Sequence, residues 1–136
     1  MTSAQVKAMR HSNMQIGAHT MSRPIFARLS DVEARAEIKG SKDCLECLLG
    51  ERISLFAYPN GRPGEDYGMK TVELVRELGF DAAVSPSGGA ARAGTDLFQI
   101  PRFTPWDRSR LRFGARMLST LWTSRPATVR LASAAG

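Results

Sequence analysis

The sequence lacks any run of apolar residues that approaches the roughly 18–20 needed to cross a bilayer. Its N-terminus also lacks the apolar segment and small-residue cleavage site of a secretory signal, so the sequence as written predicts a cytoplasmic protein. Cysteine is scarce too, because Cys44 and Cys47 form a single C-x-x-C with no second pair, half of what a structural zinc site requires. Since they fall within a predicted helix rather than at its N-terminus, we interpret them as two helical thiols.

Acidic residues are almost absent from the last quarter of the chain. Residues 1–101 hold 12 basic and 12 acidic side chains, whereas residues 102–136 hold seven arginines against Asp107 alone, which accounts for the net charge of +6. Such a tail could meet an anionic surface, RNA or a membrane. The composition alone favours a solvated helix face over a nucleic-acid or membrane partner. The remaining composition, 43% hydrophobic and 24% charged, is ordinary for a globular domain.

Apolar residues alternate between helical and strand periods along the chain. Ser30, with Glu33 three residues later, is typical of a capping box, and Gly50 marks the end of that helix. The stretch 53–58 is rich in β-branched and aromatic residues and predicts the strongest strand. The patterns predict helices over residues 4–12, 30–49, 66–78 and 107–122, strands over 14–20, 53–58, 80–84 and 97–100, a loop over 86–94 and a frayed end beyond Pro126.

The spacing of apolar residues also predicts the faces of the second and the last of these helices. For the helix over 30–49 the residues expected to recur on the inner face are Val32, Ala36, Ile38, Leu45, Leu48 and Leu49. For the last helix, Leu111, Met117, Leu118, Leu121 and Trp122 are expected on one side, and Arg108, Arg112 and Arg116 on another.

Strands separated by helices imply β-α units around a mostly parallel sheet, so the predicted fold class is α/β. In such sheets, ligands bind beyond the carboxyl ends of the strands. Three places lie at predicted strand ends: His19, the turn at Pro59-Asn60-Gly61, and Arg102. The candidate site is therefore expected among these residues.

Residues 16–24 read Ile-Gly-Ala-His-Thr-Met-Ser-Arg-Pro. This segment resembles the second signature of the NodB-homology polysaccharide deacetylases, in which H-[ST]-x-x-H-P follows a strand. In that family the two histidines bind a divalent metal, zinc or a similar ion, together with an aspartate from an earlier strand. Residues four apart lie on one face of a helical turn, so that both imidazoles can reach a single ion.

Other segments are similar to the same family in the same order. They are Glu37-Ile38-x-Gly40-Ser41-Lys42, the third signature Phe56-Ala57-Tyr58-Pro59-Asn60-Gly61, then Gly79-Phe80-Asp81-Ala82-Ala83-Val84, and Pro101-Arg102-Phe103. The resemblance covers about residues 4 to 105. It implies a partial version of the deformed (β/α) barrel that the family uses.

The resemblance also implies an activity and roles for residues. The intact family hydrolyses N-acetyl groups of amino sugars in a polysaccharide or oligosaccharide, a non-peptide C–N bond. By this resemblance His19 would ligate the metal, and the backbone N–H of Asn60 would contact the oxyanion. Arg102 would orient a carboxylate, and Tyr58 and Pro59 would contact the substrate.

Two departures from the family's pattern matter. The opening signature, a strand ending in Asp-Asp-Gly that supplies the catalytic base and a metal-binding aspartate, would precede Ala4 and is absent. Arg23 occupies the position of the second metal histidine, and a guanidinium has no lone pair to offer a metal. We therefore expect a truncated domain in which metal binding is impaired and activity is weak or absent.

The domain organisation follows from these observations. We expect a partial NodB-homology domain over residues 1–106, and a basic amphipathic helix with a frayed tail over residues 107–136. A missing first strand would leave an open sheet edge beside His19, through which the chain could self-associate. Three hypotheses stay open: a deacetylase of carbohydrate metabolism, a non-catalytic remnant or sugar-binding scaffold, and a small basic protein that binds a polyanion or a membrane surface.

Overall fold

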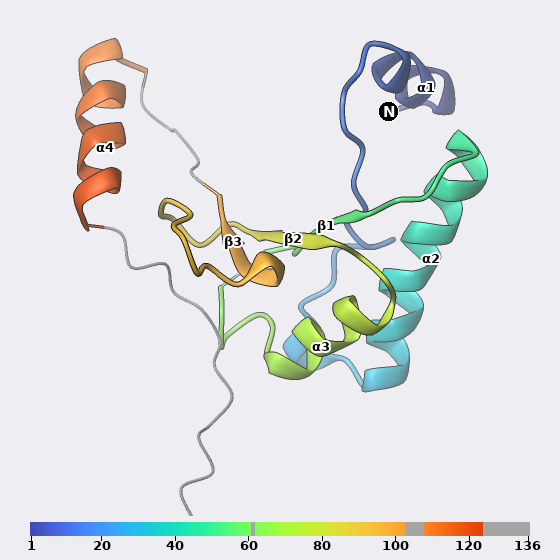
Figure 1. Ribbon diagram of the computed structural model, residues 1–136. Helices are drawn as coiled ribbons and strands as arrows, with labels where there is room; N and C mark the ends of the chain where they lie inside the picture. Colours follow the sequence, from blue (N-terminus) through green and yellow to red (C-terminus); the bar gives the residue numbers. More distant parts are fainter. Residues whose placement is uncertain (61, 103–107, 124–136) are drawn as a thin grey trace, which may run out of the picture.

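The computed structural model describes residues 1–60, 62–102 and 108–123 (Figure 1). The elements follow in the order α1 (Ser3–His11), η1 (Phe26–Arg28), α2 (Asp31–Leu49), β1 (Leu55–Ala57), α3 (Met69–Glu77), β2 (Ala82–Ser85), η2 (Leu97–Gln99), β3 (Ile100–Pro101) and α4 (Arg110–Thr123). No helix within the described ranges is both long and apolar enough to span a membrane.

The three strands form a parallel sheet in the order β1-β2-β3. Phe56 of β1 pairs with Ala83 of β2, and Ser85 of β2 pairs with Pro101 of β3. On the free side of β1, Ala18 forms a single parallel bridge to Phe56. Figure 1 shows α2 and α3, which contact each other, on one side of this sheet. The fold is α/β with a parallel sheet, as the sequence predicts.

Local signals account for the ends of the longest helix. The Ser30 side chain accepts a hydrogen bond from the Glu33 N–H while the Glu33 carboxylate accepts from the Ser30 N–H, which confirms the predicted capping box. Gly50 ends α2 in the left-handed conformation, with φ of 70°, as expected for a residue without a Cβ. Cys44 and Cys47 lie on this helix as exposed free thiols.

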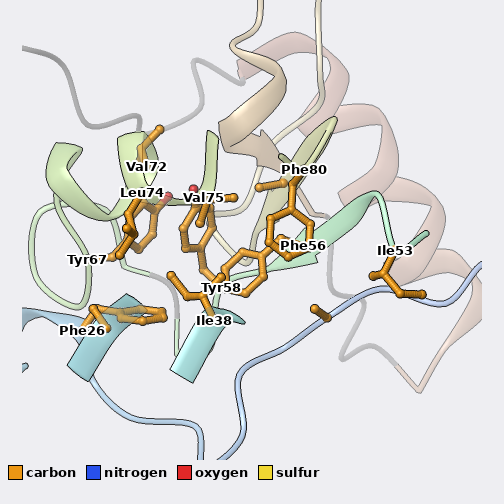
Figure 2. Close-up of a cluster of buried hydrophobic side chains, with 13 residues drawn as sticks. Phe26, Ile38, Ile53, Phe56, Tyr58, Tyr67, Val72, Leu74, Val75 and Phe80 are labelled. Atoms are coloured by element: carbon orange, nitrogen blue, oxygen red, sulfur yellow. The ribbon is translucent and has the colours of Figure 1, made fainter. Parts of the chain in front are cut away.

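The core lies between the sheet and the two helices that cover it. Phe56 contacts Tyr58 and Phe80 through its ring, at centroid distances of 5.2 and 5.4 Å, and Figure 2 shows it between them. Helix α2 contributes Ile38, and α3 contributes Val72, Leu74 and Val75. Phe56 and Tyr58 lie two residues apart, so both side chains point to this same buried face of β1.

The structure corrects the predicted inner face of α2. Val32 is 79% exposed, and Ala36 is exposed as well. The predicted Ile38 is buried, and the predicted Leu45 and Leu49 pack against the core. The other buried residues of α2 are Ala34 and Ser41, four before and three after Ile38, as in one helical stripe. Val32 and Ala36 are each two residues from Ala34, about 200° around the helix, and so lie on the opposite side from this stripe.

All four predicted strands are shorter than expected: the strand over 53–58 is reduced to Leu55–Ala57, and that over 80–84 to Ala82–Ser85. Of residues 14–20, only Ala18 pairs with a strand in the described part of the chain. Of residues 97–100, the first three form the 3-10 helix η2, and Ile100 begins β3. The Asp96 carboxylate accepts a hydrogen bond from the Phe98 N–H at 3.0 Å, which favours the helical turn at this point.

The last helix begins at Arg110, three residues later than predicted. Residues 103–107 and 124–136, which include the proposed boundary between residues 106 and 107 and the tail beyond Pro126, lie outside the described residues. Figure 1 shows α4 apart from the sheet and from α2 and α3.

Candidate functional site

His19 follows the bridge that holds its segment against β1. The Ala18 N–H donates to the Leu55 carbonyl at 2.8 Å, and the Ala57 N–H donates to the Ala18 carbonyl at 2.9 Å. Gly17 permits this close approach, since a Cβ there would lie 3.0 Å from the Leu55 carbonyl oxygen. The half-buried His19 side chain is thereby placed at the carboxyl end of β1.

One hydrogen bond sets the orientation and tautomer of the His19 ring. Its Nδ1 lies 2.8 Å from the Ala57 carbonyl oxygen. Because a carbonyl can only accept, Nδ1 carries a proton, and in the neutral ring Nε2 keeps its lone pair. Histidines that bind metals are oriented in the same manner, by donation from the other ring nitrogen to a carbonyl or carboxylate. Nε2 of His19 is therefore available as a ligand or a hydrogen-bond acceptor.

The segment after His19 is a bent loop, not the helical turn that the spacing of positions 19 and 23 predicts. Thr20 and Arg23 have φ of 60° and 58°, which a right-handed helix does not allow. The Thr20 hydroxyl donates to the His19 carbonyl at 2.6 Å and accepts from the Arg23 N–H at 3.1 Å. These local side-chain bonds replace the helical hydrogen bonds. Arg23 is exposed in this arrangement.

Glu37 of α2 holds this loop in place, a role that the sequence analysis missed. Its carboxylate accepts hydrogen bonds from the Met21 N–H at 2.8 Å, the Ser22 N–H at 2.9 Å and the Ser22 hydroxyl at 2.7 Å. Partial burial acts to raise the pKa of Glu37, but the hydrogen bonds from Ser22 and Met21 together outweigh it and lower the pKa. The resemblance of Glu37-Ile38 to the family's helix was the available signal.

The structure places Tyr58 and Pro59 in the core at the end of β1. Tyr58 is 1% exposed, its hydroxyl donates to the Phe98 carbonyl at 3.0 Å, and its ring stacks on Tyr67 at 4.1 Å. Burial raises the pKa of Tyr58 well above its usual value. Pro59 is also fully buried. Both residues thus pack in the core next to the turn, and their contact with substrate stays a prediction.

Asn60 is the first exposed residue of the turn that follows β1. Its φ of 62° turns the chain, and asparagine tolerates this left-handed conformation better than most residues. Within the described residues, no backbone carbonyl accepts a hydrogen bond from the Asn60 N–H. This N–H can therefore donate to a bound oxygen, as predicted for the oxyanion contact, although nothing in the structure tests that contact.

Arg102 lies at the end of β3. Its N–H donates to the Ser85 carbonyl at 2.8 Å, and its side chain is exposed. The parallel pairing brings the ends of four neighbouring segments to one edge of the sheet, in the order His19, Asn60, Ser85 and Arg102. Since neighbouring strands are about 4.8 Å apart, His19 and Asn60 are the near neighbours, and Arg102 stands farther along the edge.

Among the described residues, no group of three or more His, Cys, Asp or Glu side chains could hold a metal ion. The hollow between α2 and α3, lined by Arg35, Lys70 and Glu77 among others, includes none of the predicted site residues. The described candidate site thus consists of one oriented imidazole, one turn N–H and exposed arginines at the carboxyl edge of a parallel sheet.

Comparison with known proteins identifies the class to which this fold and edge belong. The model of the polysaccharide deacetylase family matches residues 1–83, and the chain belongs to this family. The comparison with curated proteins gave no match.

Solved structures agree with this assignment. The chain is similar to the deacetylase PplD of Streptococcus pyogenes, solved in complex with acetate, at 27% identity and a TM-score of 0.75, over 88% of this chain and 50% of that one. A polysaccharide deacetylase from Bacillus cereus shares the fold at 20% identity and a TM-score of 0.72, over 85% of this chain and 35% of that one. IcaB from Ammonifex degensii shares the fold at 19% identity and a TM-score of 0.70, over 88% of this chain and 53% of that one. The chain thus spans about half or less of each structure's length.

Proposed function

We propose that this chain forms the His19 side of a polysaccharide deacetylase site, which acts on the N-acetyl groups of amino sugars. The observation that carries the proposal is the oriented ring of His19 in a chain that belongs to this family: its Nδ1 donates to the Ala57 carbonyl, so that Nε2 can accept a ligand. The acetate bound to the similar deacetylase of Streptococcus pyogenes is the product that hydrolysis of an acetyl group would release.

The residues of this edge would act on the acetyl group in distinct ways. The N–H of Asn60 would donate to the oxygen on which negative charge develops, a contact that stabilises the transition state more than the ground state. The exposed guanidinium of Arg102 would orient a carboxylate. Glu37 would keep the loop after His19 in one conformation, so that the imidazole does not have to be ordered at each turnover.

The described residues fit a divalent cation only in part. A catalytic zinc ion takes three protein ligands, and these residues offer Nε2 of His19. Arg23 at the second ligand position carries a permanent positive charge, which repels a cation. We therefore expect the chain by itself to bind zinc weakly and to release little or no acetate, and to need carboxylate ligands from elsewhere.

The exposed guanidinium of Arg23 favours one alternative, a scaffold that binds acetylated sugars without cleaving them. The two proposals differ in how sugar binding and acetate release depend on zinc. For a scaffold, sugar binding is independent of zinc, whereas for an incomplete enzyme the addition of the missing ligands restores both zinc binding and acetate release.

The edge beside His19 is also a candidate surface for self-association. Both hydrogen-bonding groups of Ala18 point to β1, so those of Gly17 and His19 point away from it. In the described part of the chain, no backbone carbonyl accepts from the N–H of Gly17 or His19. An open strand edge of this kind pairs readily with another chain. A monomer in sedimentation equilibrium at all accessible concentrations would contradict this proposal.

Zinc binding by three variants tests the metal assignment. Arg23→His should raise the affinity for zinc by about tenfold, which is about 1.4 kcal/mol of binding free energy, because a second imidazole joins His19. Histidine is among the residues that accept the left-handed conformation of position 23. His19→Ala should remove the binding, whereas His11→Ala, at an exposed position of α1, serves as the matched control. Calorimetry measures all three.

The same proteins are then tested for activity on an N-acetylglucosamine oligomer, with released acetate as the readout. Stoichiometric zinc and rapid acetate release by the unmodified chain would show that its site is complete. Equal zinc affinity in the unmodified chain and in Arg23→His would reject position 23 as the second ligand position.

A further inference from the structure

Helix α4 exposes two large aliphatic side chains in the described part of the structure. Leu111 and Leu118 are 87% and 68% exposed, whereas Phe113 and Met117, two and six positions after Leu111, lie on a different side of the helix. Leu111 and Leu118 are seven residues apart, almost two full turns, and so lie on the same side of the helix. Figure 1 shows α4 separated from the rest of the described chain. Two exposed leucines stacked almost two turns apart form a narrow apolar strip that a partner can cover.

The other side of α4 is positively charged. Arg112 and Arg116 are four residues apart, one turn, and lie on one side together, while Arg110 stands in the first turn. The helix contains no acidic residue. In the described part of the chain, neither Arg110 nor Arg112 forms an ion pair with a carboxylate. Within the described residues, the charges of Arg110 and Arg112 are therefore not neutralised by acids.

We propose that α4 lies flat on an anionic lipid membrane, with Leu111 and Leu118 below the headgroups and Arg112 and Arg116 among the lipid phosphates. A helix with one apolar and one basic side is the structure that binds in this way. Charge complementarity favours this occupant, because residues 1–101 carry equal numbers of basic and acidic side chains and the excess lies in residues 102–136. The membrane would thus meet α4, and the rest of the domain would stay in water.

The same features disfavour two other occupants. A nucleic acid would bind the arginines but would leave the leucines in water, since phosphates provide no apolar surface. A second copy of the chain would cover the leucines, but it would bring two arginine-rich helices together, and like charges repel. An anionic bilayer covers the apolar side and pairs with the basic side at once, which neither of these two occupants does.

The test is co-sedimentation of the 136-residue chain with lipid vesicles. The protein should bind vesicles of equal parts phosphatidylglycerol and phosphatidylcholine at least about tenfold more strongly than pure phosphatidylcholine, and binding should weaken as salt rises. The double variant Arg112→Glu and Arg116→Glu should lose at least about tenfold in binding. The matched control reverses two exposed charges outside α4, Lys7→Glu on α1 and Arg28→Glu on η1, and should lose less than about twofold.

A second double variant, Leu111→Gln and Leu118→Gln, tests the apolar side and should also lose at least about tenfold in binding. Circular dichroism and urea unfolding verify that every variant is folded. Equal binding to neutral vesicles, or no binding to anionic ones, would overturn the proposal. So would binding to single-stranded RNA that needs the arginines but not the leucines, or a dimer that the leucine substitutions dissociate.

Discussion

Removal of the Glu37 carboxylate should loosen the loop that follows His19. The variant Glu37→Ala deletes the acceptor of three hydrogen bonds, from the Met21 N–H, the Ser22 N–H and the Ser22 hydroxyl. A hydrogen bond to a charged acceptor contributes about 1.5–3 kcal/mol when buried, but these bonds are solvent-exposed, and water replaces much of each. Alanine also favours the helix by a few tenths of a kcal/mol. We expect a net loss of about 1–2 kcal/mol in the free energy of unfolding.

The pH dependence of this loss provides an independent measure. Because the hydrogen bonds lower the pKa of Glu37 in the folded state, its stabilising contribution is fully present above the unfolded pKa of about 4.3. The contribution disappears as the pH falls through the lower folded pKa. The difference in stability between the unmodified chain and Glu37→Ala should therefore shrink at acid pH.

Urea unfolding at pH 7 and pH 3 measures the difference, and hydrogen exchange of the Met21 and Ser22 amides reports directly on the loop. Glu73→Ala, at an exposed position of α3, is the matched control and should have little effect. The reasoning is refuted if Glu37→Ala unfolds at the same urea concentration as Glu73→Ala and leaves the exchange of both amides unchanged.

Two further substitutions test the supports of the candidate site. Tyr58→Phe should cost about 1–2 kcal/mol in urea unfolding, since it leaves the Phe98 carbonyl without its donor; an unchanged midpoint would contradict this. Because burial raises the pKa of Tyr58, the unmodified chain should also lose stability above pH about 10, where the unfolded tyrosine ionises, and Tyr58→Phe should lose less. Gly17→Ala should cost about 1–3 kcal/mol in the free energy of unfolding, because its Cβ meets the Leu55 carbonyl oxygen at 3.0 Å. Gly68→Ala, with open space around it, is the control. Equal unfolding midpoints for the two variants would reject the predicted clash.

Local patterns predicted the elements that depend on neighbouring residues. The capping box of Ser30 and Glu33 and the left-handed stop at Gly50 lie within a few residues of the bonds they make, so the ends of α2 could be predicted. The inner face of α2 was predicted less accurately. Ile38, Leu45 and Leu49 do face the core, but Val32 and Ala36 are apolar residues on the opposite side of the helix. The apolar residues over 97–100 likewise predict a strand, whereas Leu97–Gln99 form a 3-10 helix.

The sequence by itself determined the α/β class, the order of the main elements and the family, because periodicity, caps and short motifs are written in consecutive residues. Only the tertiary structure decided how His19 is oriented and how its loop is held. These depend on Ala57, 38 residues away from His19, and on Glu37, 15 residues away from Ser22. It also decided that Tyr58 faces the core and that the leucines of α4 stay exposed. Contacts between residues so far apart in the sequence depend on how strands and helices pack in space. Periodicity and capping motifs involve only neighbouring residues and therefore do not predict such contacts.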